Sequence, residues 1–237
     1  MPKTALVTGG SGAVGGAVVR AFAREGYSVA FTYRNGEEAA RQLEAVTGAL
    51  AFKAELTKGA GVARLVEDVT GRFGGIDVLV NTVGRTQVMP FALIEEEDWD
   101  EVIAANLKPM FLASKEAARS MISRRSGVII NIGSIAGHRL LEVPVHYAAA
   151  KAAVSGFTTA LAMELARFGI RVNEIVPGLL SKGVGTLVPE KEMKEYLNYC
   201  TAGRPGEPEE VAEVALFLAS DRASYINAQS IHVNGGI

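Results

Sequence analysis

Tyr147 and Lys151 are the two side chains whose types and spacing point most directly to chemistry. They stand four residues apart in a segment of helical composition, so both side chains face the same side of a helix and can interact. A tyrosine with an ordinary pKa of about 10 is a poor acid–base catalyst at neutral pH, but a neighbouring ammonium favours the phenolate and lowers that pKa. The pair therefore suits proton donation to a carbonyl oxygen during hydride transfer.

Other polar residues stand where the predicted fold could bring them to this pair. Ser134 places a hydroxyl at the carboxyl end of the fifth predicted strand, and Asn106 lies inside a long predicted helix. An amide inside a helix competes for backbone hydrogen bonds, so its presence there indicates a purpose. Without these further polar residues, a tyrosine and a lysine at this spacing would more often belong to an ordinary helix.

A glycine-rich turn follows the first predicted strand. Gly10, Gly12 and Gly15 form the pattern G-x-G-x-x-G between a strand and a helix. Glycine is needed in such a turn where the backbone approaches a pyrophosphate at the helix N-terminus. The alternative is a tight turn with no ligand.

The end of the second predicted strand bears on the choice of cofactor. A dinucleotide fold usually has an acidic residue there that binds the ribose 2′-hydroxyl. This chain has Arg34 instead, with no carboxylate before Glu37. A cation suits an adenosine 2′-phosphate, so the sequence predicts NADPH over NADH; the alternative is a solvated arginine.

Short β-branched segments alternate with longer amphipathic ones, which is typical of βαβ units and a parallel sheet. We expect an α/β fold, a single doubly wound Rossmann-type domain over residues 1–237, with a seven-stranded parallel sheet and helices on both faces. The predicted strands are 4–8, 28–33, 49–54, 78–81, 128–132, 171–176 and 230–233. The predicted helices are 14–25, 37–45, 61–73, 99–123, 145–168 and 208–219.

Residues 181–206 do not fit the alternation and contain their own short helix near 190–199. Open α/β sheets bind ligands beyond the carboxyl ends of their strands, and this segment leaves from such an end. We therefore expect a substrate lid, with a plain surface excursion as the alternative.

Composition excludes several classes of function. With 24 Lys and Arg against 26 Asp and Glu, the chain has no excess of basic residues for nucleic acid. One cysteine cannot form an internal disulfide, and the three histidines lack metal-ligand spacing. Apolar stretches end well before the roughly 20 residues that span a bilayer. The first residues lead straight into a strand pattern rather than a signal peptide. These features predict a cytoplasmic protein without a metal or a membrane anchor.

Together, these motifs resemble the short-chain dehydrogenase/reductase family over essentially the whole chain. Its glycine motif matches at Thr8, Gly9 and Gly15, with Ala13 in place of the middle glycine. The catalytic tetrad of the family matches at Asn106, Ser134, Tyr147 and Lys151, and two further family elements match residues 81–84 and 173–178.

The resemblance implies a mechanism and a set of binding residues. Tyr147 would protonate the carbonyl oxygen, and Ser134 would polarise it. Lys151 would lower the tyrosine pKa and hold the nicotinamide ribose, while Asn106 would hold a relay water. The implied cofactor-binding residues are Gly9, Ser11, Gly12, Ala13, Val14, Gly15, Arg34, Glu55, Leu56, Asn81, Val83, Gly84, Tyr147, Lys151, Pro177, Gly178 and Leu180.

Within the family, the chain is most similar to β-ketoacyl-[acyl-carrier-protein] reductases and acetoacetyl-CoA reductases, through segments 169–173, 203–212 and 231–236. The resemblance implies an acyl carrier protein near Arg125, although a second arginine position falls on Phe168. The alternative for Arg125 is a basic helix end. The apolar segment 138–146 should wall the substrate pocket and suit an acyl chain. Its two histidines, His138 and His146, are expected to be hydrogen-bonded wall residues.

Two other functions stay open: an alcohol or polyol dehydrogenase, against which Arg34 and the apolar wall argue, and a nucleotide-sensing module, against which the intact tetrad argues. Apolar residues on several faces of the helices that bear Asn106 and Tyr147 indicate a subunit interface. The resemblance implies a homotetramer.

Overall fold

The computed structural model describes residues 2–138 and 142–237, and its strands form one parallel sheet. The strand order is β3-β2-β1-β4-β5-β6-β7, so the chain reverses direction across the sheet between β1 and β4. This is the doubly wound arrangement that the alternating sequence predicts. The strands are β1 Thr4–Thr8, β2 Ser28–Tyr33, β3 Leu50–Lys53, β4 Val78–Asn81, β5 Gly127–Ile132, β6 Ile170–Pro177 and β7 Ser230–Val233.

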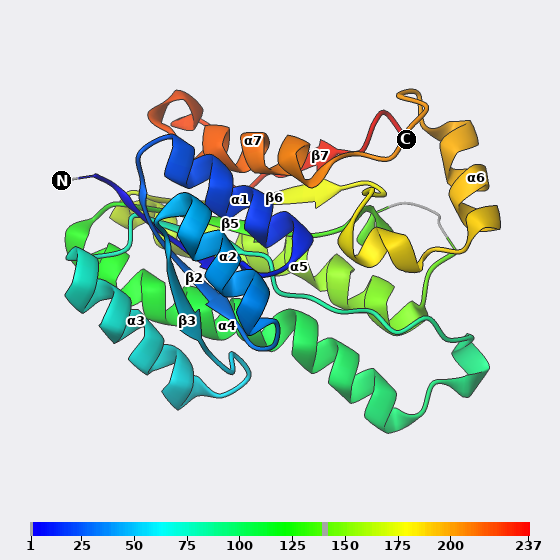
Figure 1. The fold of residues 1–237 in the computed structure, drawn as a ribbon, viewed down its shortest axis with the longest axis horizontal. Helices are drawn as coiled ribbons and strands as arrows, with labels where there is room; N and C mark the ends of the chain where they lie inside the picture. Colours follow the sequence, from blue (N-terminus) through cyan, green and yellow to red (C-terminus); the bar gives the residue numbers. More distant parts are fainter. Residues whose placement is uncertain (1, 139–141) are drawn as a thin grey trace.

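Helices cover both faces of the sheet (Figure 1). One apolar core joins the sheet to α1, α2 and α7, and a second core joins the opposite face to α3, α4 and α5. The inner strands β2, β1, β4, β5 and β6 are largely buried from both sides, which explains why they are apolar rather than alternating in sequence, whereas the edge strands β3 and β7 are partly exposed. The helices are α1 Ala13–Arg24, α2 Glu37–Thr47, α3 Gly59–Phe73, α4 Glu96–Arg124, α5 Val145–Leu165, α6 Glu190–Tyr199 and α7 Pro208–Ala219.

Two helix boundaries differ from the prediction by three residues, and several others differ by one or two. The fourth helix begins at Glu96 rather than at Trp99, because Glu95 and Asp98 form a capping box that satisfies backbone donors one turn earlier. The fifth helix ends at Leu165 and continues as a 3₁₀ turn to Phe168, where Gly169 adopts a left-handed φ of 70°. Apolar periodicity does not reveal either cap.

Polar residues form one row across the apolar sheet. Asn81 of β4 is in register with Asn131 of β5, which is in register with Glu174 of β6. The Asn81 amide donates to Asn131 at 2.9 Å, and the Asn131 amide donates to Thr158 of α5 at 3.0 Å. These bonds fix α5 against the carboxyl-terminal half of the strands, where parallel sheets build their ligand sites.

The segment after β6 leaves the sheet and returns to it. It contains a 3₁₀ turn at Gly183–Leu187 and helix α6, which stands apart from the other helices in Figure 1. The two ends of this segment meet at Leu179, Ser181 and Gly206, which we call its neck. Two backbone hydrogen bonds of 2.9 Å join them, from Ser181 N to the Gly206 carbonyl and from Gly206 N to the Leu179 carbonyl. Across the described ranges, no helix is long and apolar enough to cross a membrane.

Candidate active site

The glycine-rich turn joins β1 to the start of α1, and its glycines serve different purposes. A Cβ on Gly15 would overlap the Gly9 carbonyl oxygen, and Gly9 itself has a φ of 71°. These two glycines therefore hold the turn tight against the helix N-terminus. Gly10, in contrast, packs on β2, because a Cβ there would lie 2.5 Å from the Phe31 ring. The first part of the G-x-G-x-x-G pattern thus reflects packing against the sheet.

The start of α1 can accept an anion. The helix begins at Ala13, and its N-cap residue Gly12 offers no side chain to cap the first backbone N–H groups. Such uncapped N–H groups at a helix N-terminus favour a phosphate. A cavity of about 420 Å³ adjoins this turn, and its lining includes Ser11, Gly12, Ala13 and Lys182.

Arg34, the cation predicted to select the cofactor, forms an ion pair with Glu55. Arg34 Nη1 lies 3.8 Å from Glu55 Oε2, and the two side chains are 59% and 42% exposed. The hydrogen bond from Thr57 is the main cause that lowers the pKa of Glu55, and the Arg34 charge adds to it. The next residue, Leu56, is buried. The arginine is therefore held at the rim by an exposed ion pair that a phosphate could replace.

The loop after β4 comes close to the catalytic candidates. A Cβ on Gly84 would lie 2.7 Å from Asn106 Oδ1 and 3.1 Å from Lys151 Nζ. The Asn81 amide, predicted among the cofactor-binding groups, donates instead to Ser114 of α4 and to Asn131. In this structure Asn81 therefore links the sheet to α4, and the residues that approach the site here are those of the loop, including Val83 and Gly84.

Asn106 is fixed by its amide and offers its oxygen to the site. Its Nδ2 donates to the carbonyls of Arg85 at 2.7 Å and Val102 at 2.8 Å. Its Oδ1 is buried and has no hydrogen-bond partner among the described residues. A buried acceptor without a partner is costly, and an ordered water is the usual remedy.

Ser134 and Tyr147 meet at the carboxyl end of β5. Ser134 caps a 3₁₀ turn, with its Oγ accepting a hydrogen bond of 3.2 Å from Ala136 N. Burial raises the pKa of the Tyr147 phenol above its ordinary value, and the hydrogen bond with Ser134 lowers it in part. The phenol is therefore protonated at neutral pH, which is the state that a proton donor requires.

Lys151 stands about one helical turn after Tyr147 on α5. Its side chain is buried, and Nζ donates to the Ile132 carbonyl at 3.1 Å. Burial lowers the pKa of Lys151 to about 8, while the charge of Glu174 raises it. The expectation that Lys151 lowers the tyrosine pKa is not met in this structure. Nζ is directed to the Ile132 carbonyl and lies 5.9 Å from the Tyr147 ring centroid, so burial decides the pKa of the phenol.

The end of β6 contacts α6. Gly178 must be small, because a Cβ there would lie 2.8 Å from Asn234 Cα. Tyr196 of α6 accepts a hydrogen bond from Leu179 N at 3.1 Å and donates to the Asn234 carbonyl at 3.2 Å. Pro177 and Leu180 are buried here. The end of β6 is thereby tied to the 181–206 segment.

The two predicted wall histidines are only partly satisfied. His138 is hydrogen-bonded, as expected, with Nε2 lying 3.0 Å from Ser155 Oγ. His146 is fully buried and its Nδ1 accepts from Tyr147 N at 3.0 Å, but its Nε2 has no partner among the described residues. Residues 139–141 of the predicted wall lie outside the described residues.

Arg125 follows the last residue of α4 and contacts the turn after α5. It follows α4 with a left-handed φ of 51°, and its Nη2 donates to the Arg167 carbonyl at 2.8 Å. Arg167 in turn lies over the Phe168 ring at 4.9 Å. The guanidinium of Arg125 thus joins the end of α4 to the turn after α5.

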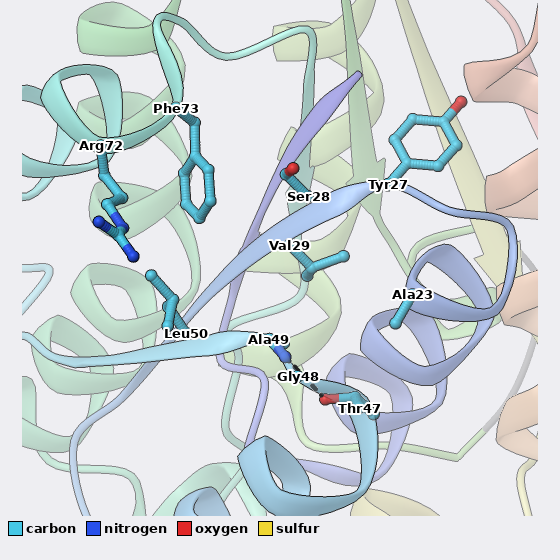
Figure 2. A pocket seen from close by; sticks show the side chains of 10 residues that line it. All are labelled: Ala23, Tyr27, Ser28, Val29, Thr47, Gly48, Ala49, Leu50, Arg72 and Phe73. Atoms are coloured by element: carbon cyan, nitrogen blue, oxygen red, sulfur yellow. Dashed lines mark hydrogen bonds between the residues drawn. The ribbon is translucent and has the colours of Figure 1, made fainter. Parts of the chain in front are cut away.

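A second cavity lies away from these residues. It has a volume of about 260 Å³ and is lined by Tyr27, Leu50, Arg72 and Phe73, among others. Figure 2 shows these side chains around the beginning of β2 and β3. The catalytic candidates lie at the opposite, carboxyl ends of the strands, so this cavity takes no part in their chemistry.

Glu174 was not predicted as a site residue. It is a fully buried carboxylate in β6, hydrogen-bonded to side chains of α5 and β7. One signal was available, since it is an acidic residue within the apolar run of a buried strand. What it contacts depends on segments distant in sequence.

Comparison with known proteins places the chain among reductases. Residues 10–237 match the family model described as enoyl-(acyl carrier protein) reductase. The chain is 37% identical to a 3-oxoacyl-[acyl-carrier-protein] reductase of Staphylococcus epidermidis, with 100% of the chain and 99% of the relative aligned. A relative of the same name from Thermotoga maritima is also 37% identical, over 99% of the chain and 97% of the relative.

A plant relative and a solved structure extend the comparison. A glucose and ribitol dehydrogenase homolog of Oryza sativa is 38% identical, over 99% of the chain and 85% of the relative. A short-chain dehydrogenase/reductase mutant of Serratia marcescens superposes with a TM-score of 0.91 at 32% identity, covering 99% of the chain and 97% of that structure. With this fold and this match over its length, the chain belongs to the short-chain dehydrogenase/reductase family.

Proposed function

We propose that this protein reduces the keto group of a 3-oxoacyl thioester, carried by acyl carrier protein or coenzyme A, to the 3-hydroxyacyl product with NADPH. The observation that carries the proposal is the buried phenol of Tyr147, which burial keeps protonated, with the Ser134 hydroxyl bonded to it and Lys151 one turn away. The names of the bacterial relatives favour this substrate class. We expect the reaction to take place in the cytoplasm.

The residues present fit a nicotinamide cofactor, the group that this family uses. The first backbone N–H groups of α1 have no side-chain cap, which suits a pyrophosphate, and a Cβ on Gly15 or Gly84 would crowd neighbouring protein groups, so both positions need glycine. We assign binding to the glycine turn, to Arg34, Glu55 and Leu56 beside the adenosine, to the β4 loop, and to residues 177–180. When bound, the reduced nicotinamide supplies the hydride that reaches the carbonyl carbon.

The protein's own residues move the proton. Tyr147 donates its phenolic proton to the carbonyl oxygen as negative charge develops there, and Ser134 donates a hydrogen bond that polarises and positions that oxygen. Lys151 holds the ribose hydroxyls as an ammonium. The phenolate left on Tyr147 would regain its proton from Lys151, and the buried Oδ1 of Asn106 would hold the water that returns a proton to Lys151.

NADPH rather than NADH is expected because Arg34 stands at the rim of the adenosine site. Its ion pair with Glu55 is exposed and 3.8 Å long, and such pairs contribute only about 0–1 kcal/mol. A dianionic 2′-phosphate can therefore draw the guanidinium away at little cost.

We further propose that the chain folds as one domain in which residues 181–206 cover the substrate. The neck bonds between Leu179, Ser181 and Gly206 would allow α6 to move as a unit. Arg125 would receive an acidic carrier by exchanging the Arg167 carbonyl for a carboxylate or phosphate. Exposed apolar side chains on α4 and α5, Phe111 and Met163, support assembly into a homotetramer.

A polyol or alcohol dehydrogenase is the second candidate, because a relative with 38% identity bears the name glucose and ribitol dehydrogenase homolog. A substrate panel separates the two. Acetoacetyl-CoA, a β-ketoacyl carrier-protein thioester, free ketones and polyols would each be assayed with NADPH or NADP and with NADH or NAD. Turnover confined to thioesters with NADPH supports the proposal, whereas activity only on free ketones or polyols rejects the substrate class.

A further inference from the structure

Glu174 is a buried carboxylate with three hydrogen-bonding neighbours. It lies in β6 with no exposed surface. Its Oε2 accepts hydrogen bonds from Ser155 Oγ of α5 at 2.7 Å and from Ser230 Oγ of β7 at 2.6 Å. Its Oε1 lies 3.5 Å from His138 Nε2. A carboxylate removed from water in this way is costly unless its partners are retained, so the arrangement needs a compensating role.

The hydrogen bonds assign a proton to His138. Ser155 has one hydroxyl proton, and it points to Glu174. The Ser155 oxygen must then accept at its 3.0 Å contact with His138 Nε2, so that nitrogen carries a proton. The His138 ring also packs edge-on against the His232 ring, with centroids 5.1 Å apart. The carboxylate therefore holds His138 by a direct contact and through Ser155.

The same carboxylate contacts the backbone that carries the catalytic serine. A Cβ on Gly133 would overlap Glu174 Oε1, so the carboxylate packs directly on the residue before Ser134. Gly133 N donates to the Ile175 carbonyl of β6 at 2.8 Å. On the other side, Lys151 Nζ donates to the carbonyl of Ile132. The backbone of 132–134 is therefore fixed between Lys151 and the β6 residues Glu174 and Ile175.

Charge links the carboxylate to Lys151 as well. Ser155 stands one helical turn after Lys151, on the same face of α5, and it binds Glu174 directly. Among the described residues, the titratable groups facing the carboxylate are Lys151 from α5 and His138 from the segment after β5, with His232 of β7 next to His138. Tyr147 faces Lys151 from the same helix.

We propose that Glu174 is a positioning residue of the reductase site, which holds residues 133–138 in place through His138 and Gly133 and faces Lys151 with its charge. This inference rests on the proposed function for its catalytic consequence. The structural consequence does not depend on the proposed function, because the contacts of Glu174 exist without substrate or cofactor.

The charge balance at Lys151 agrees with this role. Burial lowers the pKa of Lys151 to about 8, and Glu174 is the group that opposes the decrease. The ammonium is present below that pH and is lost as the pH rises through it. If the carboxylate is neutralised, the pKa of Lys151 falls further, and the loss of the ammonium begins at a lower pH.

The test is Glu174→Gln, which keeps the size of the side chain and removes its charge. The matched control is Glu213→Gln, which removes an exposed carboxylate of α7 that pairs with Arg24. Amide hydrogen exchange is measured on the protein without cofactor or substrate. We expect faster exchange in peptides covering 133–138 of E174Q, with unchanged exchange in α1, and wild-type exchange throughout that segment in E213Q.

The second readout is the pH profile of kcat/KM for the thioester. We expect about tenfold lower kcat/KM in E174Q, because a small displacement of a catalytic group is enough for such a loss. The alkaline fall of the profile should move to lower pH in E174Q and stay in place in Glu174→Asp, which retains the charge. A role limited to packing would not move it.

The outcomes are distinct. Wild-type exchange at 133–138 in E174Q overturns the proposal whatever the activity, and so does an unmoved alkaline fall. Absence of any thioester reduction in the wild-type protein rejects the proposed function and leaves the exchange experiment as the test of positioning. If E174Q does not fold, Ser230→Ala removes one donor to the carboxylate and should accelerate exchange in the same peptides, whereas wild-type exchange there overturns the proposal.

Discussion

The two halves of the rim at the carboxyl ends of the strands are built by different means. Around β1 to β3, the site consists of backbone N–H groups, glycines and an exposed ion pair between Arg34 and Glu55. Around β4 to β6, it consists of buried polar side chains such as Asn106, Lys151 and Glu174. Exposed charges are solvated in any arrangement, whereas each buried polar group depends on particular partners.

This difference predicts where substitutions act. On the β1 to β3 side, changes should alter which cofactor is used and how tightly, with small effects on the chemical step. On the β4 to β6 side, changes should reduce turnover strongly, since the groups proposed to act on the reacting oxygen lie there together with the groups that hold them in place.

The strongest test of the buried half is Tyr147→Phe. It removes the proton donor and leaves the ring, so kcat should fall by more than the roughly 10²–10³-fold that a single oxyanion donor contributes. Steady-state kinetics with NADPH measure the loss, and cofactor affinity by fluorescence serves as the control because the ring is retained. Wild-type turnover in this variant would remove Tyr147 from the mechanism.

Ser134→Ala should have the next largest effect. In the proposed mechanism the serine hydroxyl stabilises charge on the reacting oxygen, so its loss should lower kcat by about 10²–10³-fold. The serine also caps the turn at Ile135–Gly137 through Ala136 N, so thermal unfolding is measured alongside. Ser134→Thr, which keeps the hydroxyl and the cap, should retain more activity than alanine; equal losses in both would argue against a role for the hydroxyl.

Gly84→Ala tests the meeting point of the two halves. The new methyl group would press on Asn106 Oδ1 and Lys151 Nζ, so we expect about tenfold lower kcat and weaker NADPH binding. Gly71→Ala is the matched control, because that glycine lies in α3 with open space around it, and alanine there should stabilise the fold by about 0.5–1 kcal/mol. Equal kinetics in both variants would show that the Gly84 backbone does not need this space.

Arg34→Asp should have a small effect on turnover and a large one on cofactor choice. We expect the KM for NADPH to rise about tenfold, since an opposite charge is replaced by a like one next to the 2′-phosphate, while kcat changes little. Glu55→Gln should instead leave NADPH preferred, because it frees the arginine from its partner. Unchanged selectivity in the aspartate variant would assign Arg34 to the solvated surface.

Within the β4 to β6 half, the sequence predicts some features and not others. The strands follow from apolar runs, and the Tyr147–Lys151 pair follows from residue type and spacing, which are local features; the family resemblance adds the roles of Ser134 and Asn106. The partners of Glu174 could not be predicted, because Ser155, Ser230 and His138 converge on it from three separate segments.

Local capping and packing account for other differences between the predicted and the observed structure. Gly10 packs on Phe31 of a neighbouring strand, a contact that the glycine motif alone cannot reveal. The early start of α4 depends on the reciprocal bonds of Glu95 and Asp98. Arg125 donates a hydrogen bond to the Arg167 carbonyl because α4 ends beside the turn after α5.

The central claim is tested most directly by following NADPH oxidation with acetoacetyl-CoA and a β-ketoacyl carrier-protein thioester, next to free ketones and polyols, in the wild-type protein and in Tyr147→Phe. We predict turnover of the thioesters with NADPH in the wild-type protein and its loss in the variant. Thioester turnover that survives the substitution, or activity confined to free ketones or polyols, would contradict the claim.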